Sequence, residues 1–181
     1  MHTNNTNIKN GFSLIEVLVS VGIVSMILLL LSSFIFQLNY SNSKTKADRE
    51  ALENARRILD IIVYEIKGAK SIYAPTTTFP STGSADQLSL ETFRYLPDGE
   101  DTSFIDFFLC GTGLCLKKES QNPVLLNSDN VSVTNLVFTR ILSGTAPSVK
   151  TAFTVSYKNP SGQPSNDASV SLNATVSLRS Y

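Results

Sequence analysis

The sequence predicts an α+β fold in which one long N-terminal helix, apolar and then amphipathic, packs on an antiparallel β-sheet domain. Three observations predict it. An apolar run extends from Phe12 to Leu38, a one-sided apolar stripe continues to about Lys67, and short alternating segments follow from Gln87 onward. A helix that is apolar all round is typical of a membrane span or a buried core, and a stripe is typical of a helix packed on a domain. Alternation with period two is typical of half-buried strands.

The first half of the helix is long enough to cross a membrane. As a helix, the run from Phe12 to Leu38 would measure about 40 Å at 1.5 Å per residue, which spans a bilayer with tilt. A short polar segment, Met1–Gly11, precedes it, and no Ala-x-Ala cleavage site closes it, so it differs from an ordinary secretory signal. An uncleaved N-terminal anchor remains the alternative to a cleaved leader.

One acidic residue, Glu16, lies near the start of this run. A carboxylate at a bilayer centre costs about 2.5–3.5 kcal/mol on insertion scales. A charge kept at that cost requires a partner.

The second half of the predicted helix, about Asn39 to Lys67, is amphipathic. Its apolar residues recur at spacings of three and four, which places them on one face. They are Ala47, Ala51, Leu52, Ala55, Ile58, Leu59, Ile62, Val63 and Ile66. Glu53 and Arg57 have the favourable i, i+4 spacing on the charged side, and Gly68 is predicted to cap the helix end. This face should bury itself against the domain.

Small residues interrupt the apolar half of the helix. Gly22, Ser25, Ser32 and Ser33 suit close packing between membrane helices. They equally suit a span that merely tolerates them.

A loop and six strands follow the helix. The segment 74–85 is rich in Pro, Ser, Thr and Gly, which predicts a loop. The strands are predicted at Gln87–Phe93, Phe104–Cys110, Leu114–Lys118, Val131–Arg140, Thr151–Tyr157 and Ser169–Arg179. Turn-forming residues separate them, so we expect an antiparallel sheet with one face on the amphipathic helix.

The two cysteines flank a short glycine-containing segment. Cys110 and Cys115 enclose Gly111–Leu114, and two apolar segments joined by a four-residue loop predict a hairpin that brings the thiols together. Disulfides persist outside the cytoplasm, so a structural disulfide is the favoured interpretation over free thiols. The spacing is not Cys-x-x-Cys, which gives little support to a redox or metal role.

Composition argues against several classes of function. The formal net charge is zero, so nothing favours nucleic-acid binding through the whole surface. The single histidine, His2, lies in the polar leader, so a chain cut after it has no histidine for a Ser-His-Asp system or a zinc site. We therefore predict a protein that is not an enzyme, with no cofactor and no metal site.

Carboxylate-pair hydrolysis remains the alternative from another class. The acidic residues of the domain show no catalytic signature, and we expect them to be scattered and solvated. They are Asp86, Glu91, Asp98, Glu100, Asp101, Asp106 and Asp129. The acidic residues around Asp98 also suggest a calcium-binding loop. This segment, however, lacks the alternation and final glutamate of an EF-hand loop.

The N-terminal residues resemble a known processing site. Gly11-Phe-Ser-Leu-Ile-Glu-Val-Leu18 is similar to the cleavage and methylation motif of type IV prepilins and type II secretion pseudopilins. The resemblance implies that a prepilin peptidase cuts between Gly11 and Phe12 and methylates Phe12. It also implies that Glu16 meets the Phe12 amine of a neighbouring subunit during filament assembly, and that the protein has the lollipop form of pilins.

The resemblance also implies partners and a location. The partners are the prepilin peptidase, other pilin or pseudopilin subunits, the inner-membrane assembly platform and, before assembly, membrane lipid. The protein would be a single-pass protein of the cytoplasmic membrane with its domain outside the cytoplasm, and then part of an extracytoplasmic filament. The expected divisions are a leader (1–11), a membrane or filament-core half of the helix (12–38), an amphipathic half (39–68) and a globular β-rich domain (69–181).

The resemblance is strong over residues 1–40 and weaker beyond. The tight mid-chain cysteine pair differs from the C-terminal disulfide loop of many major pilins, which favours a minor subunit that primes or caps a type IV pilus or a secretion pseudopilus. A major pilin is the next alternative. A competence-type pilin that takes up DNA is another, for which Lys117 and Lys118 are the sequence hint.

Overall fold

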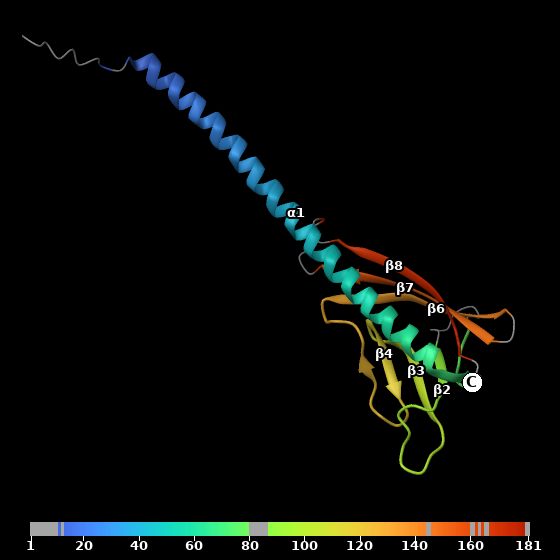
Figure 1. Cartoon of the computed structure of the whole chain (residues 1–181). Helices are drawn as coiled ribbons and strands as arrows, with labels where there is room; N and C mark the ends of the chain where they lie inside the picture. Colours follow the sequence, from blue (N-terminus) through green and yellow to red (C-terminus); the bar gives the residue numbers. More distant parts are fainter. Residues whose placement is uncertain are drawn as a thin grey trace, which may run out of the picture. The chain divides into compact units, whose positions relative to one another are not determined.

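The computed structural model describes residues 11, 13–79, 87–143, 146–159, 162, 164 and 167–179. Within these residues one helix is followed by strands alone, as the α+β prediction requires (Figure 1). Residues 1–42 and 43–181 form two compact units, and each is described by itself.

The helix α1 extends from Leu14 to Gly68, close to the predicted limits. Gly68 does not act as the predicted cap, because it is the last helical residue and lacks the positive φ of a left-handed cap. Its missing side chain serves another purpose, since a Cβ at this position would collide with the Arg94 guanidinium. The glycine therefore gives Arg94 access to the helix end.

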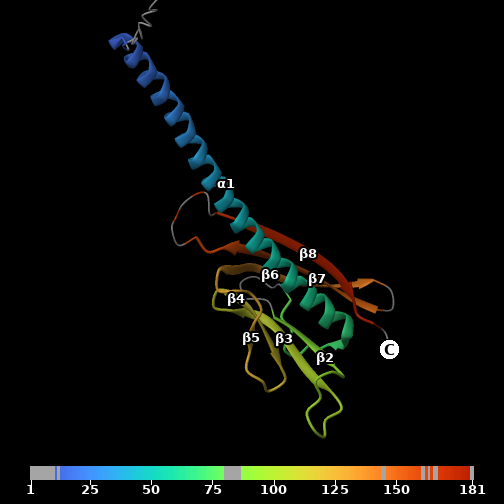
Figure 2. The same ribbon diagram turned by 60° about the vertical axis from the view of Figure 1, so that its left-hand side comes forward.

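The strands form two antiparallel sheets where a single one was predicted (Figures 1 and 2). The first sheet has the order β1 (Ala69–Ile72), β2 (Gln87–Thr92), β3 (Ser103–Cys110), β4 (Gly113–Lys118), β5 (Val124–Leu125). The second has the order β6 (Val131–Ser143), β7 (Ala146–Tyr157), β8 (Ser169–Ser177). A backbone bond from Val133 N–H to the Thr112 carbonyl, 2.9 Å long, links β6 to the β3–β4 turn without merging the sheets.

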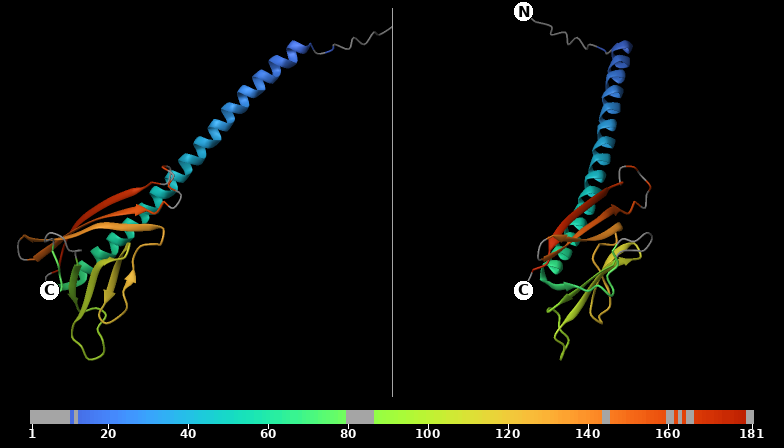
Figure 3. Two further views of the ribbon diagram at one scale, coloured as in Figure 1. Left: turned by 180° about the vertical axis from the view of Figure 1, so that it is seen from behind. Right: turned by 90° about the vertical axis from the view of Figure 1, so that its right-hand side faces the viewer.

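Both sheets share one core with the amphipathic face of α1 (Figure 3). Ile58, Ile62 and Ile66 are fully buried there, and they pack with Phe107 of the first sheet and Phe153 of the second. The apolar stripe therefore packs against the domain, as the sequence predicted. A second, smaller cluster joins Ala47 and Ala51 of the helix to Ala168.

A polar seam fixes the helix to the segment between β5 and β6. The Asn54 side chain accepts a 2.9 Å hydrogen bond from the Ser128 N–H, and the Ser128 hydroxyl donates to Glu50. Arg57 donates to the Leu126 carbonyl. Asn54 lies on the apolar stripe, three residues after Ala51, and is therefore buried. Its hydrogen bonds satisfy the polar side chain at this buried position.

Candidate functional site

The start of α1 holds the residues predicted to be processed. Gly11 is exposed, and Phe12 lies outside the described residues. The Ser13 carbonyl accepts hydrogen bonds from the N–H groups of Glu16 and Val17, at 3.0 and 3.3 Å, which begins the helix. Glu16 thus lies in the first helical turn, where the helix dipole favours a negative charge.

The residues that follow Glu16 form an apolar surface on every side of the helix. Large side chains from Leu14 to Leu38 are each at least half exposed in the single chain. By length and composition this helix could cross a membrane. Glu16 is the one charged residue between Lys9 and Lys44 in the sequence, so it stands alone in a surface that needs lipid or other chains to cover it.

The serines of this half are compatible with an apolar environment. The Ser25 hydroxyl donates to the Val21 carbonyl at 2.7 Å, and Ser32 donates to Leu28 at 2.8 Å. These bonds to the preceding helical turn satisfy both hydroxyls without another chain. A Cβ on Gly22 would meet nothing within 4 Å, so its surface is open to a close neighbour.

Comparison with known proteins identifies this end of the chain. Residues 6–32 match the family model described as the prokaryotic N-terminal methylation motif. The chain carries the N-terminal motif of the type IV pilin and pseudopilin superfamily. No curated protein and no solved structure gives a significant match. The motif together with the helix and its antiparallel sheets is a pilin-like α+β arrangement, and the single apolar helix fits a membrane anchor by its length and composition.

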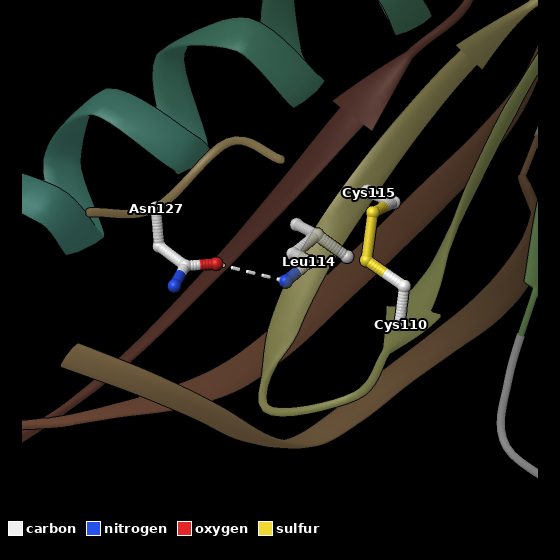
Figure 4. Close-up of a disulfide and its surroundings, with 4 residues drawn as sticks. All are labelled: Cys110, Leu114, Cys115 and Asn127. Carbon is white, nitrogen blue, oxygen red and sulfur yellow. Dashed lines mark hydrogen bonds between the residues drawn. A yellow bond between two sulfur atoms is a disulfide. The ribbon is translucent and has the colours of Figure 1, made fainter. Parts of the chain in front are cut away.

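Beyond this pilin-type N-terminus, Cys110 and Cys115 are joined by a disulfide across the β3–β4 hairpin, with their Cα atoms 5.8 Å apart (Figure 4). The turn contains two residues, Gly111 and Thr112, and not the predicted four, because Cys110 already pairs with Gly113. Gly111 has a φ of 60°, the pattern of a type II′ turn, which glycine favours at this position. The cysteines are therefore diagonal neighbours on one face of the hairpin.

A buried asparagine, which sequence reasoning missed, anchors this hairpin to the rest of the domain. Asn127 accepts a 3.0 Å hydrogen bond from the Leu114 N–H (Figure 4) and donates to the carbonyls of Ser128 and Val131. A Cβ on Gly113 would collide with the Asn127 side chain. Gly113 therefore leaves room for Asn127 to join the β3–β4 hairpin to the start of β6.

Most of the domain's acidic residues that were weighed as a carboxylate-pair or calcium site are exposed. Asp98, Glu100, Asp101 and Asp129 are solvated, as predicted, and Asp86 lies outside the described residues. Two predictions of solvation were wrong. Glu91 is half-buried and accepts from Lys70 and Ser71, whose hydrogen bonds lower its pKa. Asp106 is half-buried and accepts from the Ser89 hydroxyl at 2.6 Å. Among the described residues, no three His, Cys, Asp or Glu side chains gather as metal ligands would.

Among the residues that the structure describes, the most buried carboxylate is Glu65, a residue that sequence reasoning did not single out. Its side chain is 4% exposed, and Oε1 accepts a 3.0 Å hydrogen bond from the Tyr95 hydroxyl. Arg94 and Lys118 approach it at 3.8 and 3.9 Å. The Lys118 ammonium also lies 3.6 Å from the centre of the Tyr95 ring, and Arg94 stacks on Tyr64.

A sequence signal for Glu65 did exist. It falls three residues after Ile62 and seven after Ile58, so it lies on the apolar stripe itself. An acid at such a position must be paired, and here it fastens the segment after β2 to the end of α1.

Proposed function

We propose that this protein is a minor pilin-like structural subunit of a type IV pilus or a type II secretion pseudopilus. A prepilin peptidase cuts it between Gly11 and Phe12 and methylates Phe12. The cut chain is held in the cytoplasmic membrane by residues 12–38, with residues 69–181 outside the cytoplasm. It then enters a filament, where it acts in assembly, priming or contacts at the tip.

One observation carries this proposal. Glu16 is a lone charge in the first turn of an apolar helix, inside a matched methylation motif. A new ammonium on Phe12 of a neighbouring subunit would neutralise that carboxylate as both leave the lipid. The mid-chain disulfide between Cys110 and Cys115 supports a minor rather than a major subunit.

The proposal is tested by replacing Glu16 with alanine or leucine. We expect membrane insertion and cleavage to persist, and recovery in sheared filaments to fall at least about tenfold, because a neighbour's amine is left unpaired. Asp48→Ala, which removes an exposed acid from the same helix, is the control and should assemble normally. Normal recovery of the Glu16 variants would contradict the proposal.

Abundance in the same filament preparations separates the minor from the major role. A minor subunit should be far less abundant than the main filament protein, whereas a major pilin would itself be the main band.

DNA uptake gains no support from the lysines that suggested it. Lys118 lies between Glu65 and the Tyr95 ring, and Lys117 lies opposite Asp106 in the β3–β4 register. Their charges are balanced locally, so they do not form a basic surface for a phosphate backbone.

A further inference from the structure

The strand β8 is an edge strand without the features that usually prevent edge-to-edge pairing. Nine residues, Ser169–Ser177, pair with β7 in an unbroken register, and they include no proline and no charged residue. Within the described part of the chain, no backbone bond reaches the opposite side of β8. The strand therefore offers a long, uncharged edge with an unbroken register.

The other sheet edges are protected. The edge strand β5 contains two residues, and β1 has four with a bulge and a lysine, Lys70. The edge of β6 is bent by a bulge at Asn135, whose φ is 53°, and is partly covered by the β3–β4 turn. The contrast indicates that β8 is left open for a partner.

The direction of the β8 backbone groups follows from two backbone hydrogen bonds at its ends. Leu178 N–H donates to β7, and the Ala168 carbonyl accepts from β7. Because the direction alternates along a strand, the even-numbered residues bond to β7 and the odd-numbered ones point away. The odd-numbered residues are all exposed: Ser169, Ser171, Asn173, Thr175 and Ser177.

The sequence of this edge is chemically symmetric about Asn173. Reading outward in both directions, Leu172 corresponds to Ala174, Ser171 to Thr175, Val170 to Val176 and Ser169 to Ser177. Beyond the strand, Ala168 corresponds to Leu178 and Asp167 to Arg179. Hydroxyls match hydroxyls, apolar residues match apolar residues, and an acid matches a base.

We propose that β8 pairs antiparallel with β8 of a second copy of this chain, about a two-fold axis through Asn173. Each odd-numbered residue then donates one and accepts one backbone hydrogen bond across the axis. Both three-stranded sheets join into one, and each Asp167 faces the Arg179 of the other copy. The hydroxyl pairs that already link β7 and β8, such as Thr154–Ser171 at 2.9 Å, continue across the joint.

This contact has a defined polarity. β8 runs in the same direction as residues 43–68 of α1, since it begins near Ala47 and Ala51 and ends near the last turn (Figures 1 and 2). The two-fold axis reverses the second copy, so these helix segments point in opposite directions. Such a contact suits copies on two filaments or two membranes that lie against each other, and it does not depend on the proposed processing or on the minor role.

Site-specific disulfide formation in the full-length chain tests the pairing. The sequence contains two cysteines, and they are bonded to each other, so an added cysteine is the one free thiol. A hydrogen-bonded pair places Cα atoms about 5.5 Å apart, so Asn173→Cys should form a dimer under mild oxidation in detergent. Ser171→Cys is the matched control, because the two Ser171 positions would be roughly 14 Å apart.

The double variant Ser171→Cys with Thr175→Cys should form the dimer again, because those positions face each other across the axis. Failure of Asn173→Cys to cross-link, or equal cross-linking of Ser171→Cys alone, would overturn the proposal. A mixed disulfide with a different protein in place of the dimer would overturn the choice of a second copy.

Charge reversal gives an independent test in the Asn173→Cys background. Arg179→Asp places two acids opposite each other at both ends and should slow cross-linking roughly tenfold. Adding Asp167→Arg should restore the rate to within about twofold, with circular dichroism confirming the fold. Absence of slowing, or slowing that the second change does not reverse, would contradict the register.

Discussion

Replacing Glu65 with alanine should destabilise the domain by about 2–4 kcal/mol. The largest contribution is the Tyr95 hydroxyl, whose hydrogen bond to a buried charged acceptor contributes roughly 1.5–3 kcal/mol. Arg94 and Lys118 have side chains that are 37% and 27% exposed, so solvent screens each ion pair to about 1 kcal/mol or less. The substitution also removes the desolvation cost of the buried carboxylate, which offsets part of this loss of stability.

Urea and thermal unfolding of the full-length protein, followed by near-ultraviolet circular dichroism, measure this loss. The melting temperature should fall by roughly 5–15 °C for a unit of this size. Tyr95→Phe removes the hydroxyl alone and should show about half the effect. Glu53→Ala, an exposed acid on the same helix, should change stability by less than about 0.5 kcal/mol.

A Glu65→Ala variant that is as stable to unfolding as the Glu53→Ala control would contradict this prediction. An increase in stability would show that burying the carboxylate costs more than its three partners return.

Three further outcomes follow from the domain. Replacing Cys110 and Cys115 together with serine should cost about 2 kcal/mol in urea unfolding, the same loss that reductant causes in the wild type, because a short loop is no longer closed. Gly113→Ala should cost roughly 1–3 kcal/mol, since its Cβ displaces the Asn127 side chain, and amide exchange at Leu114 should rise. Glu91→Gln should destabilise at pH 7 and progressively less below about pH 4.5, the usual pKa of the group. The folded pKa is lowered, so this carboxylate stabilises above its unfolded pKa and ceases to do so as pH falls through the folded value; a difference that does not change with pH would contradict this.

The sequence predicted best those elements whose apolar residues repeat regularly over a long segment. The stripe through Ile58, Ile62 and Ile66 predicted the buried helix face, and all six predicted segments form strands. One limit was wrong, because β7 begins at Ala146, five residues before its predicted start at Thr151. β1 and β5 were missed because four and two residues are too short to show an alternation. Their pairing is decided by the neighbouring strand, which no local pattern reports.

The division into two sheets and the shared polar contacts depend on residues far apart in the sequence. Asn127 joins β4 to the start of β6, and Glu65 contacts the loop after β2 and the end of β4, so neither role is visible in a local window. Gly68 illustrates the opposite error. It was interpreted from its local position as a cap, whereas tertiary contact with Arg94 explains it.

The measurement that tests the central claim most directly is the intact mass of the protein purified from cells with an active prepilin peptidase. The proposal predicts a chain that begins at Phe12 with one added methyl group, and a Gly11→Val variant that stays uncut in the membrane. A wild-type chain that retains Met1 under these conditions would contradict it.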